Sequence, residues 1–313
     1  MKIGLIGLGR WGKKILNTIL KIENIELSCV ASRNKETIKL IKNDCRIYEN
    51  WNDLINHPNL QGIIIATPPR THYQIAKISI LKTIPVLIEK PLTLNLKEAI
   101  HLKNLAIKMN TILMTEFTQV FNPKFTELVK SIELINGIKS IITEAGNYGP
   151  VRKDAPVLWD WGSHELSIIL SLMKSKPKLI SAQRIMEEKN NLGDKSSWNI
   201  ICDFENNISS FSSISNISTK KRRLGVIGNN GMLVLDDYHK YPLQFHKGWA
   251  SKIFPTKDGT RINITNKNEP LLEALLEFFT SIRTNQLNHW SLDLGVNVTD
   301  LLDKCSNKNL DLN

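Results

Sequence analysis

Two short motifs in this chain carry side chains that can move a proton or stabilise charge. Lys90 follows an apolar run and stands between Glu89 and Pro91. Asp160 and His164 are four residues apart, which places both on one face of a helix. An imidazole that titrates near neutral pH can act as a general base, and an ammonium group can stabilise a developing oxyanion. The motifs therefore allow proton-coupled chemistry at a hydroxyl or carbonyl group.

Each motif also has a simpler interpretation. Lys90 could be an exposed residue at a strand end, although its position before Pro91 would hold it rigidly and is compatible with a cis peptide bond. Asp160 could be the N-terminal cap of a helix, with His164 hydrogen-bonded in a structural role. The i, i+4 pair could hold a metal ion, but no third ligand is evident, so we expect no metal site.

Residues 7–12 read Gly-Leu-Gly-Arg-Trp-Gly, a G-x-G-x-x-G sequence that follows an apolar strand and opens a helix. In this context Gly7 permits a tight turn, Gly9 lets the backbone approach a pyrophosphate, and Gly12 allows the helix to pack closely on the strand. The N-terminus of the helix would then face the phosphates. The motif predicts a dinucleotide site; the alternative is a glycine-rich turn without a ligand.

The residues after the second strand bear on cofactor choice. An NAD site usually has Asp or Glu there, whereas this chain has Ala31, Ser32 and Arg33. Ser32 can donate to a 2′-phosphate and Arg33 offers a bidentate guanidinium, so we expect NAD(P) with NADP favoured. The alternative is that Arg33 stacks on the adenine and the site accepts both cofactors.

Thr67 and Pro68 follow a buried β-branched strand and so lie at the sheet edge where doubly wound folds bind ligands. We expect both to contact the cofactor. His72 follows shortly after, either in contact with the cofactor or as a solvated or capping residue.

The order of elements predicts an α/β fold. Short apolar strands alternate with helices up to about residue 120, which indicates a doubly wound parallel sheet of the Rossmann type. From Leu179 to about Phe254 the sequence is strand-like with turn signals, which indicates an open, mainly antiparallel sheet. Further helices are expected at about 35–42, 123–135, 160–173, 270–283 and 292–304.

Taken together, the glycine turn, Ala66–Pro69, Glu89-Lys90-Pro91, Phe121-Asn122-Pro123 and the Asp160-x-x-x-His164 pattern resemble the glucose–fructose oxidoreductase / inositol dehydrogenase / MocA family. The resemblance spans nearly the whole chain. Residues 146–150 and 157–164 are similar to a bacterial subgroup of sugar-modifying dehydrogenases. One departure is Val120, where many members carry a basic or aromatic residue, so a specific substrate is not transferred.

The resemblance implies a Rossmann domain at 1–120 that binds NAD(P), and an α/β domain at 121–313 for substrate binding and oligomerisation, whose C-terminal helix could pack on the first domain. It implies Lys90, Asp160 and His164 as the catalytic residues. Asn122, Tyr148 and Trp161 could line a sugar-binding cleft, the alternative being ordinary packing. The expected cofactor contacts are Gly7, Gly9, Arg10, Trp11, Gly12, Ser32, Arg33, Thr67, Pro68, His72, Glu89 and Lys90.

We therefore expect a dehydrogenase that transfers a hydride between nicotinamide and a secondary alcohol or ketone of a sugar, cyclitol or nucleotide-sugar. His164 would accept the hydroxyl proton, Lys90 would stabilise the oxyanion, and Asp160 would orient the substrate or His164. Two alternatives remain open. One is a redox-neutral, glycosidase-like enzyme that holds its NAD tightly, and the other is a non-catalytic NAD(P)-binding regulator.

The composition excludes several other classes. The net charge is +11, but Arg supplies only 10 of the 41 positive charges and the basic residues are scattered, so we expect no nucleic-acid partner. No apolar stretch is long enough for a membrane helix, no signal peptide is evident, and the four cysteines form no CxxC pair. We expect a cytoplasmic homo-oligomer, either a dimer or a tetramer, acting on a small molecule.

Overall fold

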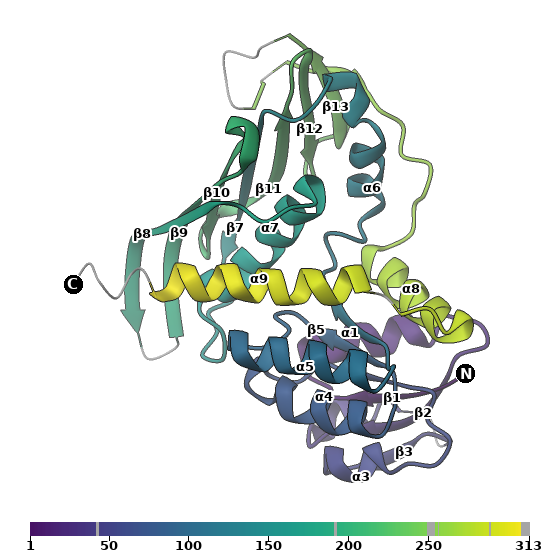
Figure 1. The fold of residues 1–313 in the computed structure, drawn as a ribbon. Helices are drawn as coiled ribbons and strands as arrows, with labels where there is room; N and C mark the ends of the chain where they lie inside the picture. Colours follow the sequence, from purple (N-terminus) through teal and green to yellow (C-terminus); the bar gives the residue numbers. More distant parts are fainter. Residues whose placement is uncertain (42–43, 191–192, 249–253, 256, 288, 308–313) are drawn as a thin grey trace. The chain divides into compact units, whose positions relative to one another are not determined.

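The computed structural model describes the chain except for residues 42–43, 191–192, 249–253, 256, 288 and 308–313 (Figure 1). The chain forms two compact units. The first comprises 1–118 and 270–299, and the second comprises 119–269 and 300–313. The chain leaves the first unit after Thr118, beside the predicted boundary at residue 120, and residues 270–299, which precede the C-terminal end, return to the first unit.

The first unit is built on a six-stranded parallel sheet. Its strand order, β3-β2-β1-β4-β5-β6, is that of a dinucleotide-binding fold, with the switch point between β1 and β4. The β-branched and apolar residues of the four central strands are buried on both faces, as parallel sheets require. The strands are β1 (Lys2–Ile6), β2 (Glu26–Ala31), β3 (Arg46–Tyr48), β4 (Gly62–Ile65), β5 (Val86–Glu89) and β6 (Leu113–Glu116).

Helices cover both faces of this sheet (Figure 1). On one face, α1 (Arg10–Ile19) contacts α8 (Pro270–Thr284), and Gly62 leaves room for Phe278 of α8. The opposite face packs against α3 (Trp51–Ile55), α4 (His72–Leu81), α5 (Leu96–Lys108) and the start of α9 (His289–Asn307). Two short helices, α2 (Lys35–Ile38) and the 3-10 turn η1 (Pro69–Thr71), complete the unit.

The second unit contains an eight-stranded sheet in the order β14-β13-β12-β11-β7-β10-β9-β8. Among the described strand pairs of this second sheet, only β7–β10 is parallel. The expected mainly antiparallel sheet is therefore confirmed. The strands are β7 (Ser140–Tyr148), β8 (Leu179–Asn190), β9 (Gly193–Asp203), β10 (Ser209–Ser215), β11 (Ile217–Ile227), β12 (Gly231–Asp236), β13 (Leu243–Lys247) and β14 (Thr260–Arg261).

Two helices pack on this second sheet. α6 (Pro123–Lys130) contacts β12, and α7 (Val157–Met173) contacts β7, β9 and β10. Gly162 of α7 faces this sheet, because a Cβ there would lie 3.4 Å from the Ile200 side chain and 3.5 Å from the Ile214 side chain. Two 3-10 turns, η2 (Ile132–Ile135) and η3 (Glu205–Asn207), link neighbouring elements. A search of the described helices found none with the length and apolar character of a membrane span.

Candidate functional site

The glycine turn lies at the carboxyl edge of the parallel sheet, beside the switch point. Gly7 has a φ of +98°, and a Cβ on it would come within 2.6 Å of the Ala66 carbonyl oxygen. A Cβ on Gly12 would collide with the Gly7 carbonyl oxygen. A Cβ on Gly9, in contrast, would meet no described atom within 4 Å. Backbone atoms of the fold therefore leave no room for a side chain at positions 7 and 12, whereas Gly9 borders open space.

That open space lies at the start of a helix. α1 begins at Arg10, with Gly9 as its N-cap, and no side chain in the described part of the chain caps it. The N–H groups and positive dipole of such a helix end attract phosphate. Because Gly9 presents no side chain to obstruct it, the turn fits the pyrophosphate of a dinucleotide. Arg10 is exposed, and the Lys14 ammonium lies 4.7 Å from the centre of the Trp11 ring.

The loop after β2 is ordered by hydrogen bonds to its neighbours. The Ser32 hydroxyl oxygen accepts from the Asn34 backbone N–H at 3.0 Å, which leaves its O–H able to donate. The Asn34 side chain donates to the Leu8 carbonyl at 3.3 Å and so connects this loop to the glycine turn. The Arg33 side chain is exposed. The loop presents a hydroxyl and a guanidinium where a ribose would be recognised.

His72 connects two loops at the same edge. One ring nitrogen lies 2.9 Å from the Thr67 carbonyl oxygen and the other lies 2.9 Å from the Pro91 carbonyl oxygen. The residue is fully buried in the first turn of α4. The alternative of a solvated histidine is wrong, because the ring has no exposed surface, whereas His72 does follow the η1 turn (Pro69–Thr71) as its C-cap residue. His72 instead holds the Thr67 loop against the turn that follows Lys90.

Glu89 is the last residue of β5, Lys90 and Pro91 follow it, and the Lys90–Pro91 peptide bond is cis. Glu89 is buried, with 8% of its surface exposed, so its predicted cofactor contact would involve little surface. Sequence reasoning missed its neighbour, Glu116, which ends β6 and pairs with Glu89 in the strand register. Burial raises the pKa of Glu116 to about 7 and raises the pKa of Glu89 well above its usual range.

The second predicted motif lies on α7, in the second unit. Helix α7 begins at Val157 with Pro156 as its N-cap, so the interpretation of Asp160 as the cap is wrong. Asp160 lies in the first turn, and His164 follows one turn later on the same face. Since Lys90 belongs to the first unit, the predicted catalytic residues are divided between the two units.

Arg152 determines the surroundings of Asp160. Its guanidinium donates to Asp160 Oδ1 at 2.9 Å and forms a two-pronged contact with Asp154, at 3.0 and 2.7 Å. The hydrogen bonds to Asp154 raise the pKa of Arg152 further. Charge-assisted pairs of this geometry fix both partners. Asp160 is therefore an oriented carboxylate.

The three predicted substrate contacts differ in their surroundings. Asn122 is buried, and its side chain caps α6 by accepting from the Lys124 N–H at 3.0 Å. Tyr148 is 73% exposed at the end of β7. Trp161 lies on α7, where the Arg222 guanidinium stands 5.9 Å from the centre of its ring. Only Tyr148 has a largely free surface, and Asn122 has a structural role as well.

Arg222 also pairs with a buried carboxyl group. Glu165 is 2% exposed, and its Oε1 lies 3.6 Å from the Arg222 guanidinium. Burial raises the pKa of Glu165, while Arg222 opposes that shift. A cavity of about 20 Å³ beside this pair, lined also by Gln119 and Asn122, has room for one water molecule.

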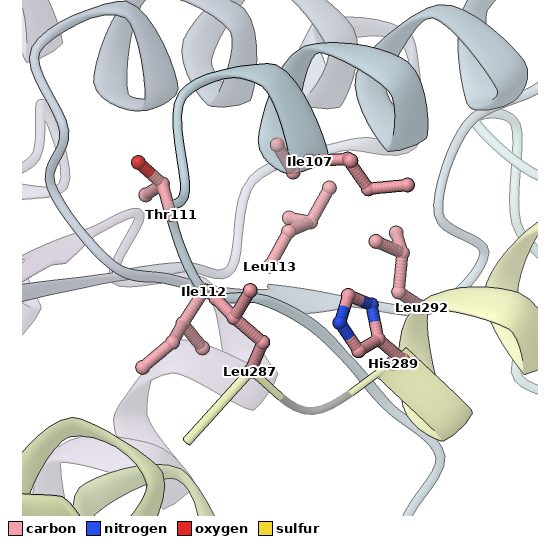
Figure 2. A pocket seen from close by; sticks show the side chains of 8 residues that line it. Ile107, Thr111, Ile112, Leu113, Leu287, His289 and Leu292 are labelled. Carbon is pink, nitrogen blue, oxygen red and sulfur yellow. The ribbon is translucent and has the colours of Figure 1, made fainter. Parts of the chain in front are cut away.

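A second cavity, of about 10 Å³, lies in the first unit, and Figure 2 shows its mainly apolar lining. Its residues come from the end of α5, the start of β6 and the start of α9, and include Leu113, His289 and Leu292. The amino end of β6 is the edge opposite the glycine turn, so this pocket is separate from the candidate site. Among the described residues, no group of three His, Cys, Asp or Glu side chains could hold a metal ion.

Comparison with known proteins places the chain in one group. Residues 1–117 match the family model GFO_IDH_MocA, described as an oxidoreductase family with an NAD-binding Rossmann fold. The crystal structure of a protein from Magnetospirillum magnetotacticum MS-1, assigned as an oxidoreductase, is 33% identical with a TM-score of 0.92. That match covers 97% of this chain and 99% of the other.

Two curated relatives are similar over shorter stretches. Myo-inositol 2-dehydrogenase of Thermotoga maritima is 26% identical over 42% of this chain and 41% of its own length. The scyllo-inositol 2-dehydrogenase (NADP(+)) IolW of Bacillus subtilis is 23% identical over 61% of this chain and 56% of its own length. The chain thus matches less than two thirds of either curated relative.

Proposed function

Because the chain belongs to the NAD-binding Rossmann oxidoreductase family of glucose–fructose oxidoreductase, inositol dehydrogenase and MocA, we propose that it is an NAD(P)-dependent dehydrogenase. Its substrate is a secondary alcohol, or the matching ketone, of a sugar, cyclitol or nucleotide-sugar. The observation that carries the proposal is the glycine turn at the switch point of the parallel sheet, with Lys90 at the end of β5 on the same edge. The two inositol dehydrogenases named above support a polyhydroxylated substrate.

The cofactor, when bound, supplies a nicotinamide carbon that accepts or returns a hydride. The N-terminus of α1 and Gly9 would hold its pyrophosphate, and Ser32 and Arg33 would recognise its adenosine ribose. No carboxylate occupies positions 31–33 to repel a 2′-phosphate, so NADP is favoured over NAD.

The proton and the charge are handled by three side chains. As the substrate C–H bond yields its hydride, the hydroxyl proton passes to His164, which acts as the general base. The Lys90 ammonium donates to the same oxygen and stabilises its developing negative charge. Asp160, which is held by Arg152, orients the substrate or His164. In the ketone-reducing direction His164 returns the proton.

The test is a screen of sugars, cyclitols and nucleotide-sugars with NAD and with NADP, read by absorbance of the reduced nicotinamide. We expect turnover with at least one polyol and tighter binding of NADP(H) than of NAD(H). Product formation without net reduced nicotinamide would instead indicate a redox-neutral enzyme. Binding of neither cofactor would overturn the proposal.

The enzyme also assembles into a homo-oligomer, a dimer or a tetramer. The support is an apolar row across the second sheet. Ile201 of β9 is 41% exposed although it lies inside the sheet, and it pairs in register with Phe211, which pairs in turn with Ile142. A row of this kind is suited to a second copy of the chain.

A further inference from the structure

Two buried carboxyl groups lie side by side at the edge of the first sheet. Glu89 is the last residue of β5, Glu116 is the last residue of β6, and the two are partners in the parallel register. Paired residues of neighbouring strands point to the same face of a sheet. The exposed fractions are 8% for Glu89 and 1% for Glu116. Water therefore solvates neither carboxyl group well.

Two adjacent buried carboxylates cannot both be ionised at low cost. In the described part of the chain, Oε1 of Glu89 and Oε1 of Glu116 each lack an N–H or O–H donor. The other oxygen of Glu116 accepts from the Thr118 hydroxyl at 2.8 Å. A single proton held between the two carboxyl groups turns one of them into a donor and satisfies both orphan oxygens.

The neighbours of the pair favour this arrangement. The charge of Glu116 raises the pKa of Glu89, whereas the Thr118 hydroxyl lowers the pKa of Glu116. Glu89 is therefore the proton donor and Glu116 the ionised acceptor. The Lys90 ammonium lowers the pKa of both groups, and the indole N–H of Trp11, from the glycine turn, lowers that of Glu89.

One negative charge thus stands beside one ammonium group. If both carboxyl groups were neutral, Lys90 would lose its buried counter-charge, and if both were ionised, two charges would draw the amine toward the protein interior. A pair with one negative charge neutralises the one positive charge of Lys90. Because Trp11 interacts with Glu89 and belongs to the glycine turn, the pair also lies beside the expected pyrophosphate site.

We propose that Glu89 and Glu116 form a proton-sharing carboxyl pair that positions the Lys90 amine for oxyanion stabilisation. Neither residue contacts the reacting atoms, so both are positioning residues. This role of the pair rests on the proposed dehydrogenase function, but the shared proton does not.

The first experiment measures the proton itself. Infrared difference spectra of the full chain, recorded from about pH 5 to about pH 9, report the C=O stretch of a protonated carboxyl group. We expect a band that persists above pH 7 in the wild type and disappears in Glu89→Gln. Glu23→Gln, which removes an exposed carboxyl group of the same unit, should leave the band intact. Absence of the band from the wild type would overturn the shared proton, whether or not a substrate is known.

The second experiment separates positioning from structure. The amide of Glu89→Gln still donates to Glu116 and preserves the single negative charge on Glu116, whereas Glu116→Gln removes that carboxylate and leaves the buried Glu89 as the only titratable member of the pair. We expect kcat of Glu116→Gln to fall about tenfold below that of Glu89→Gln, with KM for the alcohol and the cofactor Kd changed little. Equal kcat values for the two variants would overturn the positioning role even if the infrared band were present.

Discussion

At the scale of single residues, the partner of a side chain decides what its chemistry can be. The Asp160 carboxylate is oriented because the Arg152 guanidinium donates one hydrogen bond to it and two to Asp154. These hydrogen bonds of Arg152 are thus directed at two carboxylates of the same chain. In the proposed mechanism Arg152 would therefore act through Asp160.

The role proposed for His164 gives the first prediction. His164→Ala removes the general base but leaves the glycine turn and the loop after β2 unchanged. Turnover should fall by about 10²–10⁴-fold, while the affinity for reduced cofactor, measured by fluorescence titration, stays the same. Turnover at the wild-type level would remove His164 from the mechanism, and a parallel loss of cofactor affinity would point to a structural role instead.

A second prediction concerns stability and pH. The pKa of Glu116 in the folded protein is about 7, above its ordinary value of 4.5, so the folded state binds a proton that the unfolded state releases. The stabilisation from this carboxyl group is complete below pH 4.5 and is lost as the pH rises through 7. Glu116→Gln has no carboxyl group at this position and does not titrate there. As the pH rises from about 5 to about 9, the free energy of unfolding of the variant should therefore increase by about 3 kcal/mol relative to that of the wild type.

Urea unfolding at both pH values measures this difference. Glu23→Gln is the control, because the carboxyl group of Glu23 is exposed and its loss should give the same small change at each pH. A difference between Glu116→Gln and the wild type that does not vary with pH would contradict the raised pKa.

The sequence could predict Glu89 but not Glu116. Glu89 stands in a recognisable tripeptide, whereas Glu116 only ends one of several apolar strands. Its importance depends on the register of β5 with β6, which a crossover of more than twenty residues sets and local patterns do not encode. The one sequence feature that could have identified Glu116 is its position at the carboxyl end of a predicted strand.

At the scale of elements, periodicity predicted long elements well and short ones poorly. The helices expected at about 160–173 and 270–283 are present as α7 (Val157–Met173) and α8 (Pro270–Thr284). Helix α3 has five residues, too few to show a helical period, and it was missed. The helix expected over 123–135 is interrupted at Ser131, whose hydroxyl donates to the Glu127 carbonyl at 2.8 Å and competes with the helical pattern.

The turn between β1 and α1 offers a matched pair of variants. Gly9→Ala adds a methyl group into open space, so the free energy of unfolding should change by only a few tenths of a kcal/mol. Because the pyrophosphate is expected there, the cofactor Kd should rise about tenfold. Gly12→Ala forces a methyl group against the Gly7 carbonyl oxygen and should cost about 1–3 kcal/mol.

Thermal unfolding and cofactor titration of both variants distinguish these effects. The expected pattern is a folded Gly9→Ala that binds weakly and a destabilised Gly12→Ala. If Gly9→Ala bound NADPH as tightly as the wild type, the pyrophosphate would have to lie elsewhere.

At the scale of the whole molecule, the sequence predicted both sheets and allowed for a C-terminal helix on the first domain, but it did not identify residues 270–299 as the part that returns. Residues 270–299 follow the second sheet in sequence, yet they belong to the first unit, where Phe278 of α8 packs beside Gly62. An apolar helical stripe shows that a helix must be buried, but not against which sheet. The continuous helix α9 begins in one unit and ends in the other, so its sequence contains no boundary signal.

Assembly is the property of the whole molecule that one substitution can test. Ile201 is 41% exposed at one end of the apolar row that it forms with Phe211 and Ile142. If that row meets a second copy, Ile201→Glu buries a charge in the interface and should weaken association about 100-fold or more. Light scattering should then give the monomer mass, against a dimer or tetramer for the wild type. Ile47→Glu, at an isoleucine that is 39% exposed on β3, should keep the wild-type mass. A monomeric wild type, or an oligomer that withstands Ile201→Glu, would show that this row is not the contact surface.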